Sequence, residues 1–155
     1  LATSGIQTGT ATAATLADTI FKAMMAVQEK SGFAADGIVI NPADYQTLRI
    51  SKDTNGQYYG GGYFHGAYGE GGITEQLPIW GIHTVVTSAI ASGTVLVGAF
   101  KLGGSVVSKG GVSVDIANTN EDDFTNNRVT VRIEERMALA LRYPAAFDKL
   151  TVSAA

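Results

Sequence analysis

The sequence predicts an α+β fold in which helices pack on a sheet of short strands. Three observations lead to this prediction. Apolar side chains recur at helical spacing over residues 15–31, a buried strand runs directly into a helix over residues 37–50, and apolar and polar side chains alternate over residues 128–143. A strand that leads straight into a helix implies a layer of helices against a sheet.

Length and composition restrict the class of protein. With 155 residues, 45% of them hydrophobic and 16% charged, the chain is predicted to form one compact domain with at most a small appendage. It has no cysteine, which excludes disulfides and thiolate zinc sites. No apolar run approaches the roughly 18 residues that span a bilayer, so we expect a soluble protein without a membrane partner. Because the sequence begins at Leu1 without an initiator Met, it is interpreted as part of a longer protein.

The charge of the chain argues against tight binding to nucleic acid. The formal charge is −3, the pI is about 5.2, and the 11 Lys and Arg residues are scattered. Tight binding to nucleic acid needs clustered cations that displace counterions. Any contact with nucleic acid is therefore expected to be loose.

The first segments are predicted to be an extended stretch and a helix. Residues 1–14 are rich in Thr, Ala, Ser and Gly and are expected to be extended and loose. A helix is predicted between Thr15, a suitable N-cap, and Gly32, a suitable C-cap. Its core stripe is predicted to be Leu16, Ile20, Phe21, Met24 and Val27.

A strand, a second helix and a turn follow. The β-branched run at residues 37–40 predicts a buried strand, and Asn41-Pro42 predicts the start of a helix that runs to Ile50. Residues 53–56 are predicted to form a turn, because Asn-Gly tolerates positive φ.

Residues 56–76 are predicted to be a long loop of glycines and aromatic residues. Ordering about twenty residues costs on the order of 20–40 kcal/mol of conformational entropy, so this loop must dock on a surface or stay mobile. Its aromatic residues are Tyr58, Tyr59, Tyr63, Phe64 and Tyr68.

The second half of the chain is predicted to consist mainly of strands. Residues 118–127 are polar and form a connection. The predicted elements are strands at 82–87 and 94–98, a helical turn at 100–105, a hairpin of 106–108 and 112–116 around 109–111, a long half-buried strand at 128–143, and a closing strand at 147–152.

Patterns typical of catalysis and cofactor binding are missing from the sequence. No Gly-x-Gly-x-x-Gly lies between a strand and a helix, and neither His65 nor His83 has a carboxylate at metal-ligand spacing. Glu134 and Glu135 are neighbours on a predicted strand and point to opposite faces, so they cannot act as a pair. We therefore predict no catalytic residue, no cofactor and no metal.

A series of segments between Gly32 and Val152 resembles one protein family. Each segment alone is weak, and their order makes the match specific. The segments are a strand followed by Asn-Pro-x-Asp-aromatic (37–45), Lys-Asp-x-x-Gly-x-Tyr (52–58), a Trp-Gly strand (77–87), Gly-Thr-x-x-Val-Gly-x-Phe (93–100), Asp-Phe (123–124), Glu-Glu-Arg-Met-Ala-Leu-Ala (134–140) and Tyr-Pro-Ala-Ala-Phe (143–147). In these features the chain resembles the C-terminal part of Hong Kong 97-type phage capsid proteins.

The resemblance implies a Hong Kong 97-like capsid fold. Residues 1–117 and 144–155 would form an axial domain with a mixed central sheet flanked by helices, and residues 118–143 a peripheral-domain segment with one long strand. The family's N-terminal arm, extended loop and spine helix are absent from the sequence. The implied function is that of a structural subunit of a tailed-phage or prophage icosahedral capsid, which self-assembles into pentamers and hexamers around double-stranded DNA without sequence-specific binding.

Partners, location and alternatives follow from the same resemblance. The partners would be copies of the protein itself, together with scaffold, portal or cement proteins. The location would be the virion, after assembly in the cytoplasm of the bacterial host. One alternative is the shell of an encapsulin-type nanocompartment, which encloses protein cargo. Another is a small α/β ligand-binding protein or hydrolase, which would require a ligand-shaped pocket containing His83 or Glu134.

Two sets of site residues also follow from the resemblance. The aromatic loop, with Tyr58, Tyr59, Tyr63, Phe64 and Tyr68, would lie near the fivefold and sixfold axes between copies. Some relatives crosslink a Lys of one subunit to an Asn of another with the help of a Glu, and by position Asn127 and Glu134 match that pair. A carboxylate in an apolar pocket can take a proton from an amine. Because the Lys-bearing loop is absent, a structural role is preferred for both residues.

Overall fold

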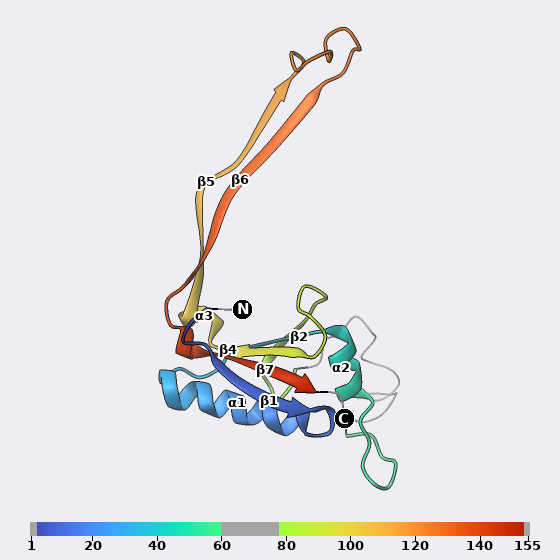
Figure 1. Ribbon diagram of the computed structural model, residues 1–155, viewed down its shortest axis with the longest axis vertical. Coiled ribbons are helices and arrows are strands. Elements are labelled where there is room, and N and C mark those ends of the chain that lie inside the picture. Colours follow the sequence, from blue (N-terminus) through green and yellow to red (C-terminus); the bar gives the residue numbers. More distant parts are fainter. Residues whose placement is uncertain (1–2, 60–77, 154–155) are drawn as a thin grey trace. The chain divides into compact units, whose positions relative to one another are not determined.

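The fold is that of a computed structural model, which describes residues 3–59 and 78–153 (Figure 1). The chain forms two compact units. The first comprises residues 1–104 and 141–155, and the second comprises residues 105–140. No helix in the described part of the chain is long and apolar enough to cross a membrane.

A five-stranded sheet organises the first unit. Its strands, in spatial order, are β1 (Gln7–Thr12), β7 (Phe147–Ser153), β4 (Thr94–Gly98), β2 (Gly37–Ile40) and β3 (His83–Val86). β1 is parallel to β7 and β2 is parallel to β3, whereas β4 is antiparallel to both β7 and β2. The predicted α+β class with a mixed sheet is confirmed.

Strand β1 differs from the loose segment expected for the first residues. It forms an edge of the sheet, with a register that runs from Gln7 opposite Asp148 to Thr12 opposite Ser153. The sequence did not indicate a strand here because Thr, Gly and Ala show no apolar alternation. The pairing partner lies at the other end of the chain, so only the tertiary structure shows it.

Helix α1 (Leu16–Ser31) follows the prediction closely. Gly32 has a φ of 73°, and its N–H donates to the Gln28 carbonyl at 2.9 Å, which is the expected glycine C-cap. The N-terminus differs in detail. Thr15 belongs to a 3₁₀ turn, η1 (Ala13–Thr15). Its hydroxyl forms a hydrogen bond with the Thr12 hydroxyl at 2.9 Å and does not cap α1.

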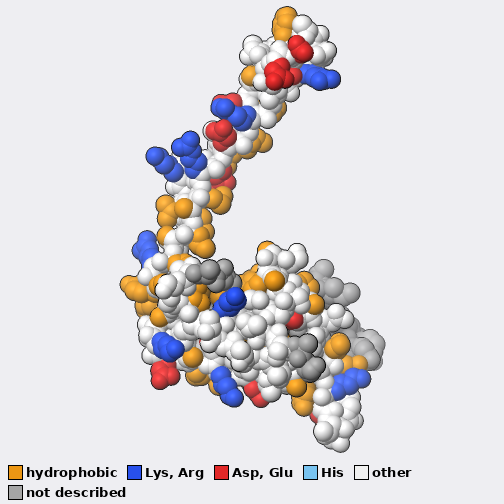
Figure 2. Space-filling model, viewed as in Figure 1, with side chains coloured by type: hydrophobic (Ala, Val, Ile, Leu, Met, Phe, Trp, Pro, Cys, Tyr) orange, Lys and Arg blue, Asp and Glu red, His pale blue; other side chains and the backbone are white. Residues whose placement is uncertain are grey.

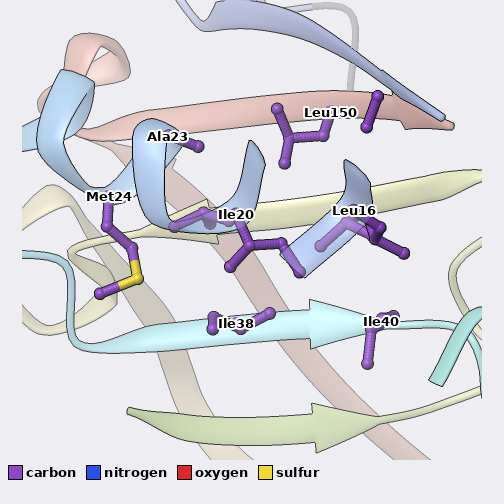
Figure 3. Packing of buried hydrophobic residues seen from close by; sticks show 10 residues of the cluster. Leu16, Ile20, Ala23, Met24, Ile38, Ile40 and Leu150 are labelled. Carbon is purple, nitrogen blue, oxygen red and sulfur yellow. The ribbon is translucent and has the colours of Figure 1, made fainter. Parts of the chain in front are cut away.

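The hydrophobic core lies between α1 and one face of the sheet (Figure 3). Because strand side chains alternate, Ile38 and Ile40 of β2 point toward the helix, whereas Gly37 and Val39 point to the opposite face. Phe21, predicted for the core, is exposed instead. Val27 of α1 is buried, as predicted. The buried residues of the main cluster are Ala11, Leu16, Ile20, Ala23, Met24, Ile38, Ile40, Val95, Val97 and Leu150.

Short elements link the strands of the first unit. Helix α2 spans Pro42–Arg49, and the side chain of its N-cap Asn41 accepts a hydrogen bond from the Ala43 N–H at 3.0 Å, as the Asn-Pro pair predicted. The predicted turn before Gly56 is also present, because the Asp53 carboxylate accepts the N–H groups of Asn55 and Gln57.

The single turn α3 (Phe100–Gly103) is held by a carboxylate. Both oxygens of Asp36 accept backbone N–H groups at its start, from Phe100 at 2.6 Å and from Lys101 at 3.0 Å. A second 3₁₀ turn, η2 (Pro144–Ala146), precedes β7. A second apolar cluster forms where these turns meet, around Ala99, Ala146 and Phe147.

The second unit consists of strands β5 (Gly104–Ala117) and β6 (Thr130–Leu141), which pair as a two-stranded sheet (Figure 1). The predicted tight hairpin around residues 109–111 is therefore wrong. Gly110 and Gly111 have φ values of 81° and 68° but lie inside the continuous strand β5, where glycines in this conformation produce an irregularity instead of a chain reversal. The predicted half-burial of residues 128–143 is also wrong, because β6 is exposed over most of its length.

Candidate functional site

The β5–β6 hairpin has one polar and one apolar face. The Arg132 guanidinium lies 2.8 Å from the Asp115 carboxylate on the neighbouring strand and 3.3 Å from that of Glu134, so these three side chains share a face. Strand alternation then directs Val114 and Ile133 to the other face. We define the hairpin apolar face as Val112, Val114, Ile116, Val131 and Ile133.

The hairpin apolar face has no cover in the described part of the chain. Each of its side chains is between 54% and 70% exposed, and hydrophobic side chains are visible along the hairpin in Figure 2. A two-stranded ribbon is only marginally stable unless a third strand or a helix packs on it. Contiguous exposed apolar surface of this kind is typical of an interaction site.

Asn127 and Glu134 lie on the hairpin at some distance from each other. Asn127 lies in the connection between the strands, three residues before β6, with a φ of 52°, and Glu134 lies in β6 and forms an ion pair with Arg132. From Thr130 to Glu134 a strand advances about 13 Å at about 3.3 Å per residue, so the two side chains do not converge within one copy. Glu134 is exposed and paired with a cation, instead of lying in an apolar pocket. Their role in crosslinking stays a prediction.

Of the predicted inter-subunit loop, only the start is described. Tyr59 is 74% exposed, and the ammonium of Lys52 lies 4.5 Å from the centre of the Tyr58 ring. The remaining predicted residues of this loop, Tyr63, Phe64 and Tyr68, lie outside the described residues. An exposed tyrosine and a cation held on an aromatic ring are compatible with a contact surface.

A groove of about 420 Å³ lies on the face of the sheet opposite α1. We call it the open-face groove. Its lining includes Val39, Val85, Phe100, His83 and Lys101. The Asp36 carboxylate also reaches it, but both oxygens are engaged by α3. The groove therefore contains His83 as well as Asp36 and Lys101, and in the described part of the chain no hydrogen bond or ion pair joins these three side chains.

A smaller hollow of about 330 Å³ lies on the hairpin, beside Gly110 and Gly111, with Lys109, Glu134 and Arg136 in its lining. Its lining is a mixture of polar and apolar surface, and it opens to solvent. Across residues 3–59 and 78–153 there is no group of three or more His, Asp or Glu side chains that could hold a metal ion.

One buried charged group was not anticipated from the sequence. Asp148 of β7 is only 5% exposed, and its Oδ1 has no hydrogen-bond partner within the described chain. Desolvation raises the pKa of this carboxyl, and the positive charge of Lys30 partly opposes that rise. Its register neighbour Gln7 does not donate a hydrogen bond to this carboxyl, because the Gln7 amide donates to the carbonyls of Ala145 and Ala26. The sequence did contain a signal. Asp148 lies two residues before Leu150 and four before Val152, so it points to the same face of the strand as these core residues.

Comparison with known proteins identifies the fold and the family. Gordonia phage Cozz has a solved structure that superposes with a TM-score of 0.71 at 13% identity, covering 99% of this chain and 51% of that one. A structure described as the capsid of an empty GTA particle, computed with C5 symmetry, gives a TM-score of 0.63 at 15% identity, covering 88% of this chain and 44% of that one. At these identities the likeness establishes a fold that capsid proteins share.

Sequence comparison gives the family directly. The major capsid protein of Enterobacteria phage HK97 is 37% identical over 143 residues, which is 92% of this chain and 35% of that protein. The Phage capsid family matches residues 1–152. The chain belongs to the phage capsid family, as was predicted from the order of its motif segments along the sequence. It spans about a third of the length of the HK97 protein.

Proposed function

We propose that the parent of this chain is a structural subunit of a tailed-phage or prophage icosahedral capsid. The observation that carries this proposal is the 37% identity to a major capsid protein across 92% of the chain. The protein would act by self-association into pentamers and hexamers that enclose double-stranded DNA, without turnover or a cofactor. It would be located in the virion after assembly in the cytoplasm of the host bacterium, with scaffold, portal or cement proteins as further partners.

The surfaces of the chain support a geometric role. The hairpin apolar face is exposed, and among the described residues no hydrogen bond or ion pair joins the ionisable side chains that line the open-face groove. The net charge of −3 suits a shell that faces DNA without gripping it. Specific self-association needs about 800 Å² from each partner, and exposed apolar strands are suited to supply such area.

The domain division remains part of the proposal. Residues 1–117 and 144–155 are proposed to form the axial domain, and residues 118–143 a peripheral-domain segment. The pairing of β5 with β6 favours an earlier start of the peripheral part, at Ser105, where the second compact unit begins. The rest of the parent protein is proposed to cover the hairpin apolar face, since a lone ribbon does not hide it.

The aromatic loop is proposed to lie between copies around the symmetry axes. The exposure of Tyr59 supports this for the described part of the loop. For Asn127 and Glu134 a structural role is proposed over crosslinking. Mass spectrometry of denatured shells checks this point, because monomers alone are expected, and a covalent ladder through Asn127 would contradict it.

Expression of the full-length parent followed by electron microscopy tests the function. We expect closed icosahedral particles, and in infected or induced cells we expect them to protect DNA of phage length from nuclease. Particles that enclose protein cargo and no DNA would favour the encapsulin-type shell instead. Discrete monomers or dimers with no particles under any assembly condition would contradict a shell function.

A further inference from the structure

Asp148 on strand β7 is the only charged side chain that is buried among residues 3–59 and 78–153. It points to the same face of the sheet as Leu150, which packs beneath helix α1. Its Oδ1 has no hydrogen-bond partner within the described chain. Because burying a charge is costly unless that charge is paired and hydrogen-bonded, this site accepts a neutral carboxyl more readily than a carboxylate.

The elements packed around Asp148 supply little to balance its charge. Strands β1 and β4 and the turn η2 contain no titratable residue, and Lys149, the next residue on β7, points to the opposite face. Among the charged residues of α1, only Lys30 lowers the pKa of Asp148, and desolvation raises that pKa by more. Within the described chain Lys30 forms no ion pair with Asp148. The charged residues of α1 are Asp18, Lys22, Glu29 and Lys30.

Strand β1 lies against the unpartnered oxygen. Gln7 is opposite Asp148 in the register of β1 and β7, and a Cβ atom added to Gly9 would lie 4.0 Å from Asp148 Oδ1. The Gln7 amide donates to the carbonyls of Ala26 at 3.4 Å and Ala145 at 2.8 Å, so it fastens β1 to α1 and η2. β1 therefore shields the carboxyl at this edge of the sheet, and release of β1 would hydrate it.

Among the elements around Asp148, β1 costs least to release. It is an edge strand, so in the sheet it pairs with β7 alone (Figure 1). Its one buried apolar side chain is Ala11, whereas β4 buries Val95 and Val97 completely and α1 buries a whole stripe of apolar residues. Elements with few buried apolar contacts open locally at a lower free energy than global unfolding requires.

We propose that Asp148 makes strand β1 a proton-sensitive latch, which stays closed on β7 and α1 while the carboxyl is neutral and opens more often once the carboxyl is ionised. The inference goes beyond the proposed function and does not depend on it. It also differs from a general loss of stability at neutral pH, because the edge strand opens while the core between α1 and the other strands stays packed.

The direction of the effect follows from the two forms of the site. When β1 is released, Asp148 is hydrated and its pKa returns toward the ordinary value of about 3.9. In the closed form the pKa is raised, so the closed form binds the proton more tightly. Below about pH 3.9 both forms are protonated and β1 is held most firmly. As pH rises through the raised pKa, the closed form must bury a charge, so the open form becomes more populated.

Amide hydrogen exchange of the 155-residue chain measures this opening. Exchange rates are divided by those of an unstructured peptide at the same pH, so that the intrinsic pH dependence of exchange cancels. We expect the protection of β1 to fall at least about threefold between about pH 5 and about pH 8, while the protection of β2 stays constant. Mass spectrometry of peptides that contain residues 7–12 or 37–40 separates the two strands.

Two variants and a matched control connect the opening with the carboxyl. Asp148→Asn removes the ionisable group, so β1 should keep the same protection at both pH values. Lys30→Gln removes the positive charge that favours ionised Asp148, so the protection of β1 at about pH 8 should fall by about a further twofold. Lys22→Gln, also exposed on α1, should behave as the natural chain does, because Lys22 does not shift the pKa of Asp148.

Three outcomes would overturn the inference. In the first, the protection of β1 in Asp148→Asn falls with pH as it does in the natural chain. In the second, β1 and β2 lose protection together, which indicates general instability. In the third, β1 keeps its protection while the amides of residues 26–31 lose theirs, which assigns the opening to the end of α1. If Asp148→Asn does not fold, an equal pH dependence in Lys30→Gln and Lys22→Gln overturns the latch by itself.

Discussion

The same alternation of β-branched side chains has opposite outcomes in the two units of this protein. In β2, Ile38 and Ile40 are completely buried beneath α1, whereas in the hairpin Val114 and Ile133 are more than half exposed. The local sequences are equally suited to strands. The difference lies in what packs on each sheet, because a helix covers the first sheet and nothing in the described chain covers the second. The side-chain pattern of a strand therefore shows which face is hydrophobic, but it does not show which element covers that face.

The largest effect is expected from a matched pair of isoleucine substitutions. Ile38→Ala should lower the free energy of unfolding by about 3 kcal/mol, because it leaves a cavity in a packed core. Ile133→Ala should change it by no more than about 0.5 kcal/mol, because the side chain is already in water. Urea unfolding followed by the fluorescence of the single tryptophan, Trp80, reports on the first unit. Equal losses in the two variants would show that the hairpin is buried in solution.

A matched pair of glycine substitutions sharpens the same comparison. At Gly98 a Cβ atom would overlap the Phe147 ring and would lie 2.9 Å from the Ala146 carbonyl oxygen, so Gly98→Ala should cost about 2 kcal/mol through overpacking. Gly110 has open space around it but a φ of 81°, so Gly110→Ala should strain the hairpin by about 1 kcal/mol. The tryptophan-monitored transition should move for the first variant only. A shift of that transition in Gly110→Ala would mean that the two units unfold together.

A smaller effect is expected from the buried carboxyl of Asp148, and it depends on pH. Its pKa is raised in the folded state, so its contribution to stability is present below the unfolded value of about 3.9 and is lost as pH rises through the folded pKa. Asp148→Asn should therefore gain stability relative to the natural chain between acidic and neutral pH, by roughly 1 kcal/mol. The urea midpoints of the two proteins at an acidic and at a neutral pH measure this gain in stability. Asp18→Asn, at an exposed position, is the control. A difference that does not vary with pH would contradict the burial of a charged Asp148.

The smallest effect is expected for the ion pairs of the hairpin. Arg132→Gln removes the contacts with Asp115 and Glu134, all of which are exposed. The tryptophan-monitored transition should not change. Amide hydrogen exchange in β5 and β6 should become slightly faster, and added salt should reproduce that change in the natural chain, because salt screens exposed charges. Strong destabilisation of the first unit would show that the pairs support more than the hairpin.

Several elements could be predicted because their signals are local. The Asn41-Pro42 helix start, the Gly32 helix end and the buried strands at residues 37–40 and 94–98 each depend on neighbouring residues. The family could also be recognised, because its segments keep their order along the chain. The pairing of β1 with β7 could not, because it joins residues at opposite ends of the chain. The pairing of β5 with β6 could not, because Lys109-Gly110-Gly111 has the composition of a turn although the strand continues through it.

The candidate surfaces show the same limit. Phe21 and Met24 occupy the same apolar stripe in the sequence, but the helix turns only Met24 into the core. Glycines 110 and 111 have the composition of a turn, but the strand continues through them. The burial of Asp148 could not be predicted from its residue type, because charged residues are usually exposed. Only its position two residues before Leu150, on the same face of the strand, indicated burial.

By itself the sequence determined the helices, most of the strands, the α+β class and membership of the phage capsid family, because these follow from local periodicity, capping residues and the order of segments. Only the tertiary structure decided the strand order, the burial of Asp148 and the pairing of β5 with β6. The physical reason is that burial belongs to pairs of surfaces. A side chain is inside or outside according to what the rest of the chain brings against it.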